Sequence, residues 1–140
     1  MTKRLTMLAV AGGLLCSAAP VEAHHSFSSQ YDANKPVALR GTISRMLWSN
    51  PHGHLYIDVQ MPDGKMVTWE LETASITGLY RRGWRREDLP VGSEVFVRGF
   101  LARDGTANAN ATTVTLVATG KELFAGSAGT GAPEEPPGER

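Results

Sequence analysis

A strand–turn–strand pattern between residues 54 and 71 places the strongest constraint on the fold. In residues 54–61 (HLYIDVQM) apolar side chains alternate with more polar ones, which is the period of a strand with one buried face. Pro62-Asp63-Gly64 follows and predicts a tight turn, because proline fixes φ and glycine tolerates a positive φ. Residues 65–71 (KMVTWEL) return as the partner strand. The segment therefore predicts an antiparallel hairpin.

The rest of the domain continues this β-rich pattern with one helical interruption. Further strands are predicted at residues 37–46, 93–100 and 111–117, and residues 120–124 can add a short edge. After Thr73, which can cap a helix, apolar residues recur at helical spacing until Gly83. The order is three strands, a helix and two strands. We therefore expect an all-β domain with one helix, a small five-stranded OB-like antiparallel barrel with the helix between strands three and four. Another small antiparallel barrel or a sandwich is the alternative.

The first 23 residues have the pattern of an export signal. Two basic residues precede a run of apolar and small residues at 5–15, and Val21-Glu22-Ala23 fits a small-x-Ala cleavage site. The apolar run is shorter than the roughly 20 residues that cross a bilayer. We therefore expect residues 1–23 to be a signal peptide and the mature protein, which begins at His24, to be periplasmic or secreted, with no membrane association after cleavage. Cleavage after an earlier alanine is the alternative.

Composition excludes several classes of protein. Fourteen basic residues balance fourteen acidic ones, so no overall charge attracts nucleic acid or anionic lipid. The one cysteine, Cys16, lies in the predicted signal peptide, so the mature domain has no disulfide, cysteine zinc site or thiol nucleophile. From residue 125 onward Gly, Ser, Ala, Pro and Glu dominate, and we expect residues 125–140 to be a disordered tail. The folded domain is then residues 24–124.

The four histidines of the chain occupy two short stretches. His24 and His25 would be the first mature residues, and His52 and His54 stand at the start of a predicted strand. Two histidines at i and i+2 of an extended chain project to one face. An N-terminal histidine can chelate a metal ion through its α-amine and its own imidazole. A further imidazole from His52 or His54 would complete a three-nitrogen site that suits Cu(II).

Other interpretations of these histidines stay open. His25 offers a second chelate through the amine, the intervening amide nitrogen and its imidazole, which again favours copper, whereas zinc is less preferred by the usual affinity order. Alternatively, all four are ordinary surface residues. The domain would then be an OB-like binding module for a peptide, a glycan or a partner protein, with no metal.

No group of residues predicts a catalytic centre. The four arginines of residues 81–86 surround Trp84, which is typical of a solvated helix end. Glu70 and Glu72 can pair with these arginines or act as carboxylate neighbours of the histidines. We therefore expect a periplasmic, non-catalytic metal-binding protein, with copper as the metal. The expected partners are the metal ion and a periplasmic protein, without nucleic acid.

Several short motifs, spread over about residues 24–123, resemble one family. The motifs are His24-His25-Ser26-Phe27, Tyr31-Asp32, Leu39-x-Gly41, Asn50-Pro51-His52, Trp69-x-Leu71-Glu72, Leu89-x-x-Gly92 and Gly99-x-x-Ala102-Arg103-Asp104-Gly105. They resemble the small exported bacterial proteins catalogued as domain of unknown function 6152. The histidine start and the Asn-Pro-His segment are the most specific parts. Because that family has no established activity, the resemblance implies a fold and a location but no reaction.

Overall fold

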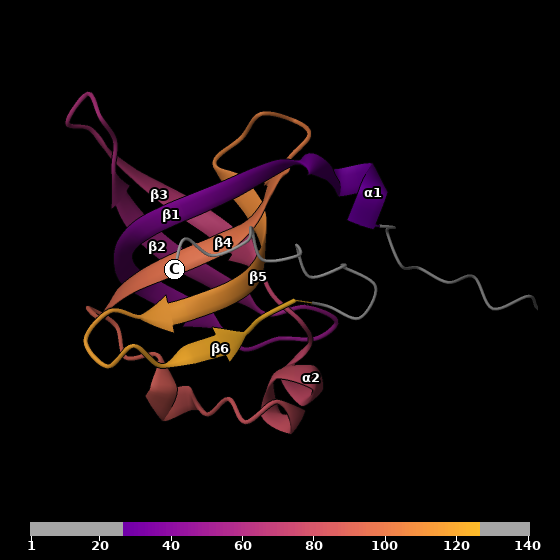
Figure 1. Cartoon of the computed structure of the whole chain (residues 1–140). Coiled ribbons are helices and arrows are strands. Elements are labelled where there is room, and N and C mark those ends of the chain that lie inside the picture. The colour runs from indigo at the N-terminus through magenta and orange to yellow at the C-terminus, as the bar shows by residue number, and fades with distance from the viewer. Residues whose placement is uncertain (1–26, 127–140) are drawn as a thin grey trace, which may run out of the picture.

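Six strands form one sheet in the computed structural model, which describes residues 27–126 (Figure 1). Short helices precede the first strand and separate the third strand from the fourth. In chain order the elements are α1 (Phe27–Gln30), β1 (Tyr31–Leu47), β2 (His54–Gln60), β3 (Met66–Glu72), α2 (Ile76–Arg81), the 3-10 helix η1 (Arg86–Asp88), β4 (Glu94–Ala102), β5 (Asn108–Leu116) and β6 (Glu122–Phe124). The prediction of an all-β domain is confirmed.

The sheet has the order β3-β2-β1-β4-β5-β6, and neighbours in this order run antiparallel. A parallel pairing between β3 and β5 joins the two sides of the series, from Glu70↔Asn108 to Glu72↔Asn110. Each of β1 to β5 therefore has hydrogen-bonded neighbours on both sides. The sequence predicts five strands with a possible short edge at residues 120–124. That edge is the sixth strand, β6, which pairs with β5.

β1 is 17 residues long because it takes part in two strand pairings. Its first part pairs with β4, from Tyr31↔Ala102 to Thr42↔Glu94, and its last part pairs with β2. A Cβ atom at Gly41 would lie 2.7 Å from the carbonyl oxygen of Asp58, so only glycine allows the two backbones to pass this closely. The strand begins six residues before the predicted start at residue 37, since its first part is stabilised by long-range pairing with β4.

The buried core lies on one face of the strands, as the alternation in β2 predicts. Leu55, Ile57 and Val59 are 0%, 0% and 7% exposed, while their neighbours along the strand are partly exposed. Each such aliphatic side chain contributes about 1.5–3 kcal/mol by leaving water. They pack with buried side chains from the other strands and from the helical segment, which are Leu39, Ile43, Leu71, Leu79, Trp84, Leu89, Val95, Val97, Val114 and Leu116.

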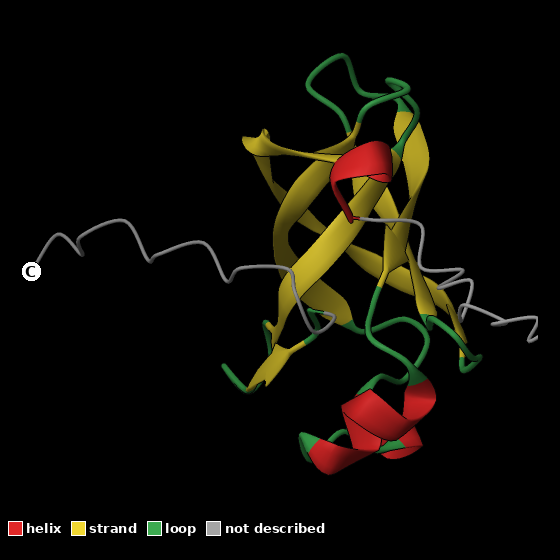
Figure 2. Cartoon of the chain, turned by 90° about the vertical axis from the view of Figure 1, so that its right-hand side faces the viewer, coloured by secondary structure: helices red, strands yellow, loops and turns green. Residues whose placement is uncertain are grey.

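The helical segment α2–η1 covers one end of this core, and Figure 2 shows these two helices together, apart from α1. Trp84 between them is fully buried, and its indole nitrogen donates to the carbonyl oxygen of Phe124 at 3.0 Å. The predicted cap at Thr73 is wrong. Ser75 caps α2, because its hydroxyl accepts from the amide of Gly78, whereas the buried Thr73 hydroxyl donates to the carbonyl of Ala74. The short helical turn that residues 84–89 predict is present as η1, whereas α1 is an additional helix.

The described chain continues through Gly126, two residues past the predicted end of the folded domain at residue 124. Ala125 is fully buried, and its amide donates to the carbonyl of Thr112 at 2.7 Å. Its own carbonyl accepts from the amide of Ala74 at 2.8 Å. The predicted signal peptide, His24 and His25, and the tail from residue 127 lie outside the described residues. Among the helices of residues 27–126, none is long and apolar enough to cross a membrane.

Candidate functional site

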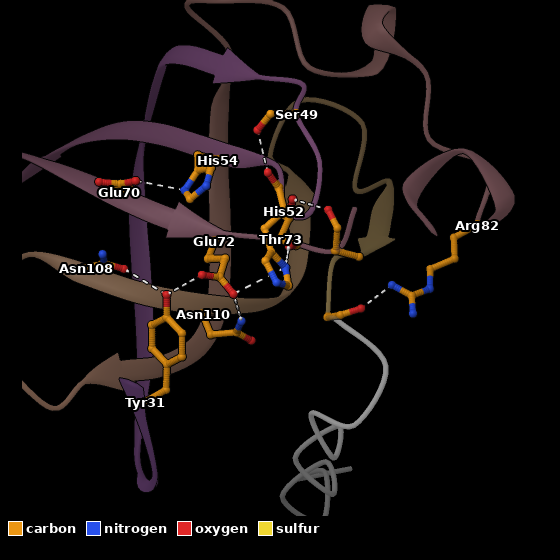
Figure 3. A network of polar contacts seen from close by, with 12 residues as sticks. Tyr31, Ser49, His52, His54, Glu70, Glu72, Thr73, Arg82, Asn108 and Asn110 are labelled. Carbon is orange, nitrogen blue, oxygen red and sulfur yellow. Dashed lines mark hydrogen bonds and ion pairs between the residues drawn. The ribbon is translucent and has the colours of Figure 1, made fainter. Parts of the chain in front are cut away.

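A polar network centred on Glu72 lies where β3 meets β5 (Figure 3). The hydroxyl of Tyr31 donates to Glu72 Oε2 at 3.0 Å. The amide nitrogen of Asn110 donates to Glu72 Oε1 at 3.5 Å, and Nδ1 of His52 lies 3.6 Å from the same oxygen. The strand register explains this meeting, because Glu72 pairs with Asn110 on one side and with His54 on the other. Four separate segments of the chain thus converge on one carboxylate.

Tyr31 is a buried side chain that faces Glu72, at 4% exposure. Its hydroxyl also lies 3.5 Å from Oδ1 of Asn108. Burial raises the pKa of this phenol well above its usual range, and the neighbouring Glu72 carboxylate raises it further. Tyr31 therefore stays a neutral hydrogen-bond donor over the whole physiological range of pH.

His52 is positioned by backbone contacts in the loop before β2. Its Nδ1 lies 3.2 Å from the carbonyl oxygen of Thr73, and its own carbonyl accepts from the hydroxyl of Ser49 at 2.6 Å. A carbonyl oxygen only accepts hydrogen bonds, so this contact places the proton of the neutral ring on Nδ1. Nε2 then keeps its lone pair, which is the arrangement found in histidines that bind metal ions.

His54 has a comparable partner on the neighbouring strand. Its Nδ1 lies 2.9 Å from Glu70 Oε1, an ion-pair contact that is not aligned as a hydrogen bond. A carboxylate at this distance again favours the proton on Nδ1 and a free lone pair on Nε2. The side chains of His52 and His54 are 33% and 29% exposed, so both rings remain accessible. Of the two roles that the sequence allows for Glu70 and Glu72, their contacts here are those of carboxylate neighbours of the histidines.

The described residues supply only part of a metal site. Within residues 27–126, no three His, Cys, Asp or Glu side chains are grouped closely enough to hold a metal ion. The two rings also have separate glutamate partners, as Figure 3 shows. His24 and His25 lie outside the described residues. A complete site would therefore need donors from beyond this part of the chain.

A pocket of about 610 Å³ lies beside the network. Gln30, Tyr31, His54, Glu72, Arg103 and Asn108 are among the residues that line it, and with Ala102 of β4 the lining comes from α1, five strands and the turn after β4. Most of these side chains are polar, and three of them belong to the network or to its histidine pair. The pocket makes the network accessible from the side where α1 lies.

Arg103 fixes α1 at the rim of this pocket. Its side-chain Nε donates to the carbonyl of Ser28 at 2.8 Å, and its backbone amide donates to the carbonyl of Gln30 at 2.9 Å. The guanidinium also lies 3.6 Å from Asp32. A four-residue helix has too few internal hydrogen bonds to persist alone, so these contacts hold it in place.

An aromatic cluster holds the same helix from the other side. Phe27 stacks on Tyr31 with ring centroids 5.6 Å apart, and it meets Phe100 edge-on, also at 5.6 Å. Because Tyr31 belongs to both the cluster and the polar network, the position of α1 is tied to that of Glu72. The helix α1, which begins two residues after His25, is therefore anchored at the pocket that His54 also lines.

Sequence reasoning missed the two asparagines of β5. Asn108 and Asn110 are two residues apart, a spacing that indicates a shared face of the strand. The parallel register of β3 and β5 sets them beside Glu70 and Glu72. Asn110 is 1% exposed, and within residues 27–126 its Oδ1 has no hydrogen-bond partner. An unpartnered buried acceptor costs about 1–3 kcal/mol, and such a cost is typical of functional sites.

The comparisons with known proteins agree with the resemblance that the motifs indicate. The model of a family of unknown function, DUF6152, matches residues 10–111, which include β1 to β4 and the polar network. The chain belongs to this family. No curated protein and no solved structure matches it. Membership of DUF6152 supplies no activity, so any function has to be argued from the site itself.

Proposed function

We propose that this DUF6152 chain is an exported, periplasmic, non-catalytic protein that binds copper through its N-terminal histidines together with His52 or His54. The domain that carries the site is an OB-like barrel. Two features support this fold: the helical segment between β3 and β4, and the parallel pairing of β3 with β5, which gives β1 to β5 neighbours on both sides.

One observation carries the metal proposal: α1 lines the same pocket as His54 and Glu72. His24 precedes Phe27 by three residues, and an extended chain spans at most about 3.6 Å per residue. The chain length therefore limits His24 to within about 11 Å of Phe27, the first residue of the helix whose Gln30 lines the pocket. This reach allows the α-amine and imidazole of a mature N-terminus at His24 to meet the ring of His54.

The donor chemistry supports copper. The α-amine, the imidazole of His24 and one Nε2 from the β2 pair are three neutral nitrogens, a set that suits Cu(II) more than Mg²⁺ or Ca²⁺. Glu70 and the carbonyl of Thr73 contact Nδ1 of His54 and His52 respectively, so they orient the rings and leave Nε2 as the metal-binding atom. The N-terminus would then supply the two donors that residues 27–126 do not provide.

The test is Cu(II) affinity measured by calorimetry, with electron paramagnetic resonance to count nitrogen ligands. The natural terminus is compared with a form extended by one glycine, with His24→Ala, with His25→Ala and with the His52→Ala/His54→Ala double variant. Lys35→Ala, an exposed residue of β1, is the matched control. The extension and His24→Ala should weaken binding similarly, by about 100-fold or more, because the extension converts the amine into an amide without a basic lone pair.

Each alternative gives a different result. If His25 provides the chelate, His25→Ala weakens binding and His24→Ala does not. A terminus before His24, found by intact mass, would exclude the α-amine chelate. Equal affinity in every variant would overturn the metal proposal altogether.

The second candidate function is a metal-free binding module for a peptide, a glycan or a partner protein. The pocket favours it, since about 610 Å³ falls within the 300–1,000 Å³ of small-ligand sites, and Tyr31, Asn108 and Arg103 supply polar groups. Oligosaccharides and acidic peptides added to metal-free protein should then shift the NMR signals of Arg103 and Asn108. Ligand binding that survives His24→Ala would support this function over the first.

A further inference from the structure

A stack of planar side chains lies at the end of the molecule that carries α2 and η1. Trp48 stacks on Tyr80, with ring centroids 5.7 Å apart and 19° between the ring planes. The guanidinium of Arg86 lies 5.2 Å from the Trp48 ring, and that of Arg85 lies 5.7 Å from the Tyr80 ring. We refer to Trp48, Tyr80, Arg85 and Arg86, together with the adjacent Arg81 and Arg82, as the arginine–aromatic surface. All but the partly buried Trp48 are exposed.

The positive charge of this surface is largely uncompensated. Arg85 is held by hydrogen bonds to the carbonyls of Tyr80 and Trp84, which fix its guanidinium without neutralising it. In the part of the chain that the structure describes, neither Arg81 nor Arg86 has an ion-pair partner. The nearby Asp88 is already paired with Lys121 at 2.6 Å. A guanidinium stacked on a ring keeps N–H groups at its edge, where carboxylates bind.

The chain leaves the described domain beside this surface. Arg82 donates a hydrogen bond to the carbonyl of Gly126, and its guanidinium lies 4.7 Å from the Phe124 ring. Residues 127–132 are small (SAGTGA), and residues 133–137 read Pro-Glu-Glu-Pro-Pro. Glu134 is eight positions beyond Gly126, which allows a reach of up to about 28 Å and an average distance of about 16 Å.

We propose that residues 133–137 dock on the arginine–aromatic surface of the same chain. Glu134 and Glu135 supply the carboxylates that Arg81, Arg85 and Arg86 lack. The flanking prolines favour the extended polyproline conformation, which packs on exposed aromatic rings such as Tyr80 and Trp48. A short flexible linker gives a local concentration in the millimolar range, so even weak contacts suffice. A segment whose composition predicts no structure of its own can order in this way on contact.

The consequence is competition for the surface. Any acidic protein that approaches the arginines must first displace residues 133–137 of the same chain. The copper proposal is independent of this docking, because α1 and the pocket lie apart from α2 and η1 (Figure 2).

A spin label in the full-length chain tests the docking. Ala132→Cys carries a nitroxide, with Cys16→Ser added wherever the signal peptide is retained, and NMR measures the broadening of the Trp48 indole N–H signal. We expect strong broadening at low salt that falls several-fold in Glu134→Gln/Glu135→Gln and at about 1 M salt, where ion pairs are screened. Arg85→Gln/Arg86→Gln should reduce it similarly. Glu122→Gln, an exposed carboxylate of β6, is the matched control and should leave it unchanged.

The proposal is overturned by any of three results. These are the absence of broadening at Trp48, broadening that is equal with and without the two glutamates, and stronger broadening at another surface such as that around Arg103. A well-dispersed spectrum in every variant shows that the domain remains folded, so loss of docking is not confused with unfolding.

Discussion

The hydroxyl of Tyr31 donates a hydrogen bond to the carboxylate of Glu72, 41 positions further along the chain. This bond links the first residue of β1 to the last residue of β3, and it joins the aromatic cluster under α1 to the polar network. A buried phenol held against a carboxylate makes the stability of the fold sensitive to alkaline pH.

Tyr31→Phe should remove an alkaline loss of stability. Burial, and then Glu72, raise the folded-state pKa of Tyr31 above the usual value of about 10. Between these two values the unfolded chain has released the proton and the folded chain has not. The contribution of Tyr31 to the free energy of unfolding is therefore fully present below about pH 10 and decreases as pH rises above it. Urea unfolding at about pH 8 and about pH 11 measures the difference.

At about pH 8, Tyr31→Phe should itself cost about 1–3 kcal/mol, because a hydrogen bond to a charged acceptor is lost. Above pH 10 its stability should fall less than that of the wild type. Tyr80→Phe, at an exposed position, is the control and should follow the wild-type curve. Parallel pH curves for the wild type and Tyr31→Phe would show that this phenol titrates alike in both states.

Asp88→Asn should reduce stability at neutral pH and flatten its acid dependence. The hydrogen bond from Lys121 holds the pKa of Asp88 below its usual range, with the amide of Arg85 adding to the effect. The stabilisation is present above the unfolded-state pKa of about 3.9 and is lost as pH falls through the lower folded-state value. We expect a cost of about 1 kcal/mol at neutral pH from thermal unfolding. Lys121→Met should show part of the loss, and an unchanged acid profile in both variants would contradict the assignment.

Gly99→Ala should be among the most damaging single-methyl additions to the sheet. A Cβ atom there would lie 2.1 Å from the backbone oxygen of Asn110, which cannot move without breaking the β4–β5 pairing. Overpacking of this kind costs about 3 kcal/mol. Gly78→Ala in α2 is the matched control, since its nearest contacts are 3.3 Å and longer and alanine favours a helix. Similar stability of the two variants in urea would count against the close approach at Gly99.

Truncations should place the boundary of the folded domain after Gly126. Removing residues 127–140 should change the free energy of unfolding by less than about 1 kcal/mol, because the proposed docking rests on surface ion pairs. Removing Ala125 and Gly126 as well breaks the hydrogen bonds with Thr112 and Ala74, at about 2 kcal/mol in total, or roughly 10 °C in Tm. Equal melting temperatures for the two truncated forms would mean that these bonds contribute little.

Arg103→Met should weaken copper binding without unfolding the domain. The variant loses the side-chain contacts to Ser28 and Asp32, so α1 is freed from the rim of the pocket and the proposed N-terminal donors are less well positioned. We expect about a 10-fold weaker Cu(II) affinity, as for other residues that orient metal ligands. Arg98→Met is the control, because Arg98 is an exposed arginine of β4 that lies over the Phe96 ring. Equal affinities in a folded Arg103→Met protein would separate the metal site from α1.

Local patterns predicted the fold best where neighbours in sequence are also neighbours in space. The β2–β3 hairpin lies within one residue of its predicted bounds, since alternation and the Pro-Asp-Gly turn determine it together. The early start of β1 depends on Tyr31↔Ala102, a pairing across about half the chain that no local pattern encodes. Ser75 caps α2 in place of the predicted Thr73, because the buried threonine hydroxyl donates to the carbonyl of Ala74.

The residues of the candidate site were likewise predictable only where local sequence patterns bring them together. His52, His54 and the two glutamates are recognisable from side-chain chemistry, and the hairpin register brings them together. Asn110 has significance only because β3 and β5 pair in parallel, a long-range feature that strand patterns do not reveal. The roles of His24 and His25 stay predictions, since both lie outside the described residues.

The pairing of β3 with β5 also limits how copies of this protein can associate. A sheet edge is a template for adding strands from another molecule, which is how many β proteins aggregate. Among the unpaired edges of residues 27–126, two are short: residues 66–69 of β3, beyond the parallel pairing, and the three-residue β6. Lys65 flanks the first of these edges and Lys121 the second, and a charged flank disfavours pairing. Concentrated solutions of the folded protein should therefore resist fibril formation, even though just over half of its described residues lie in strands.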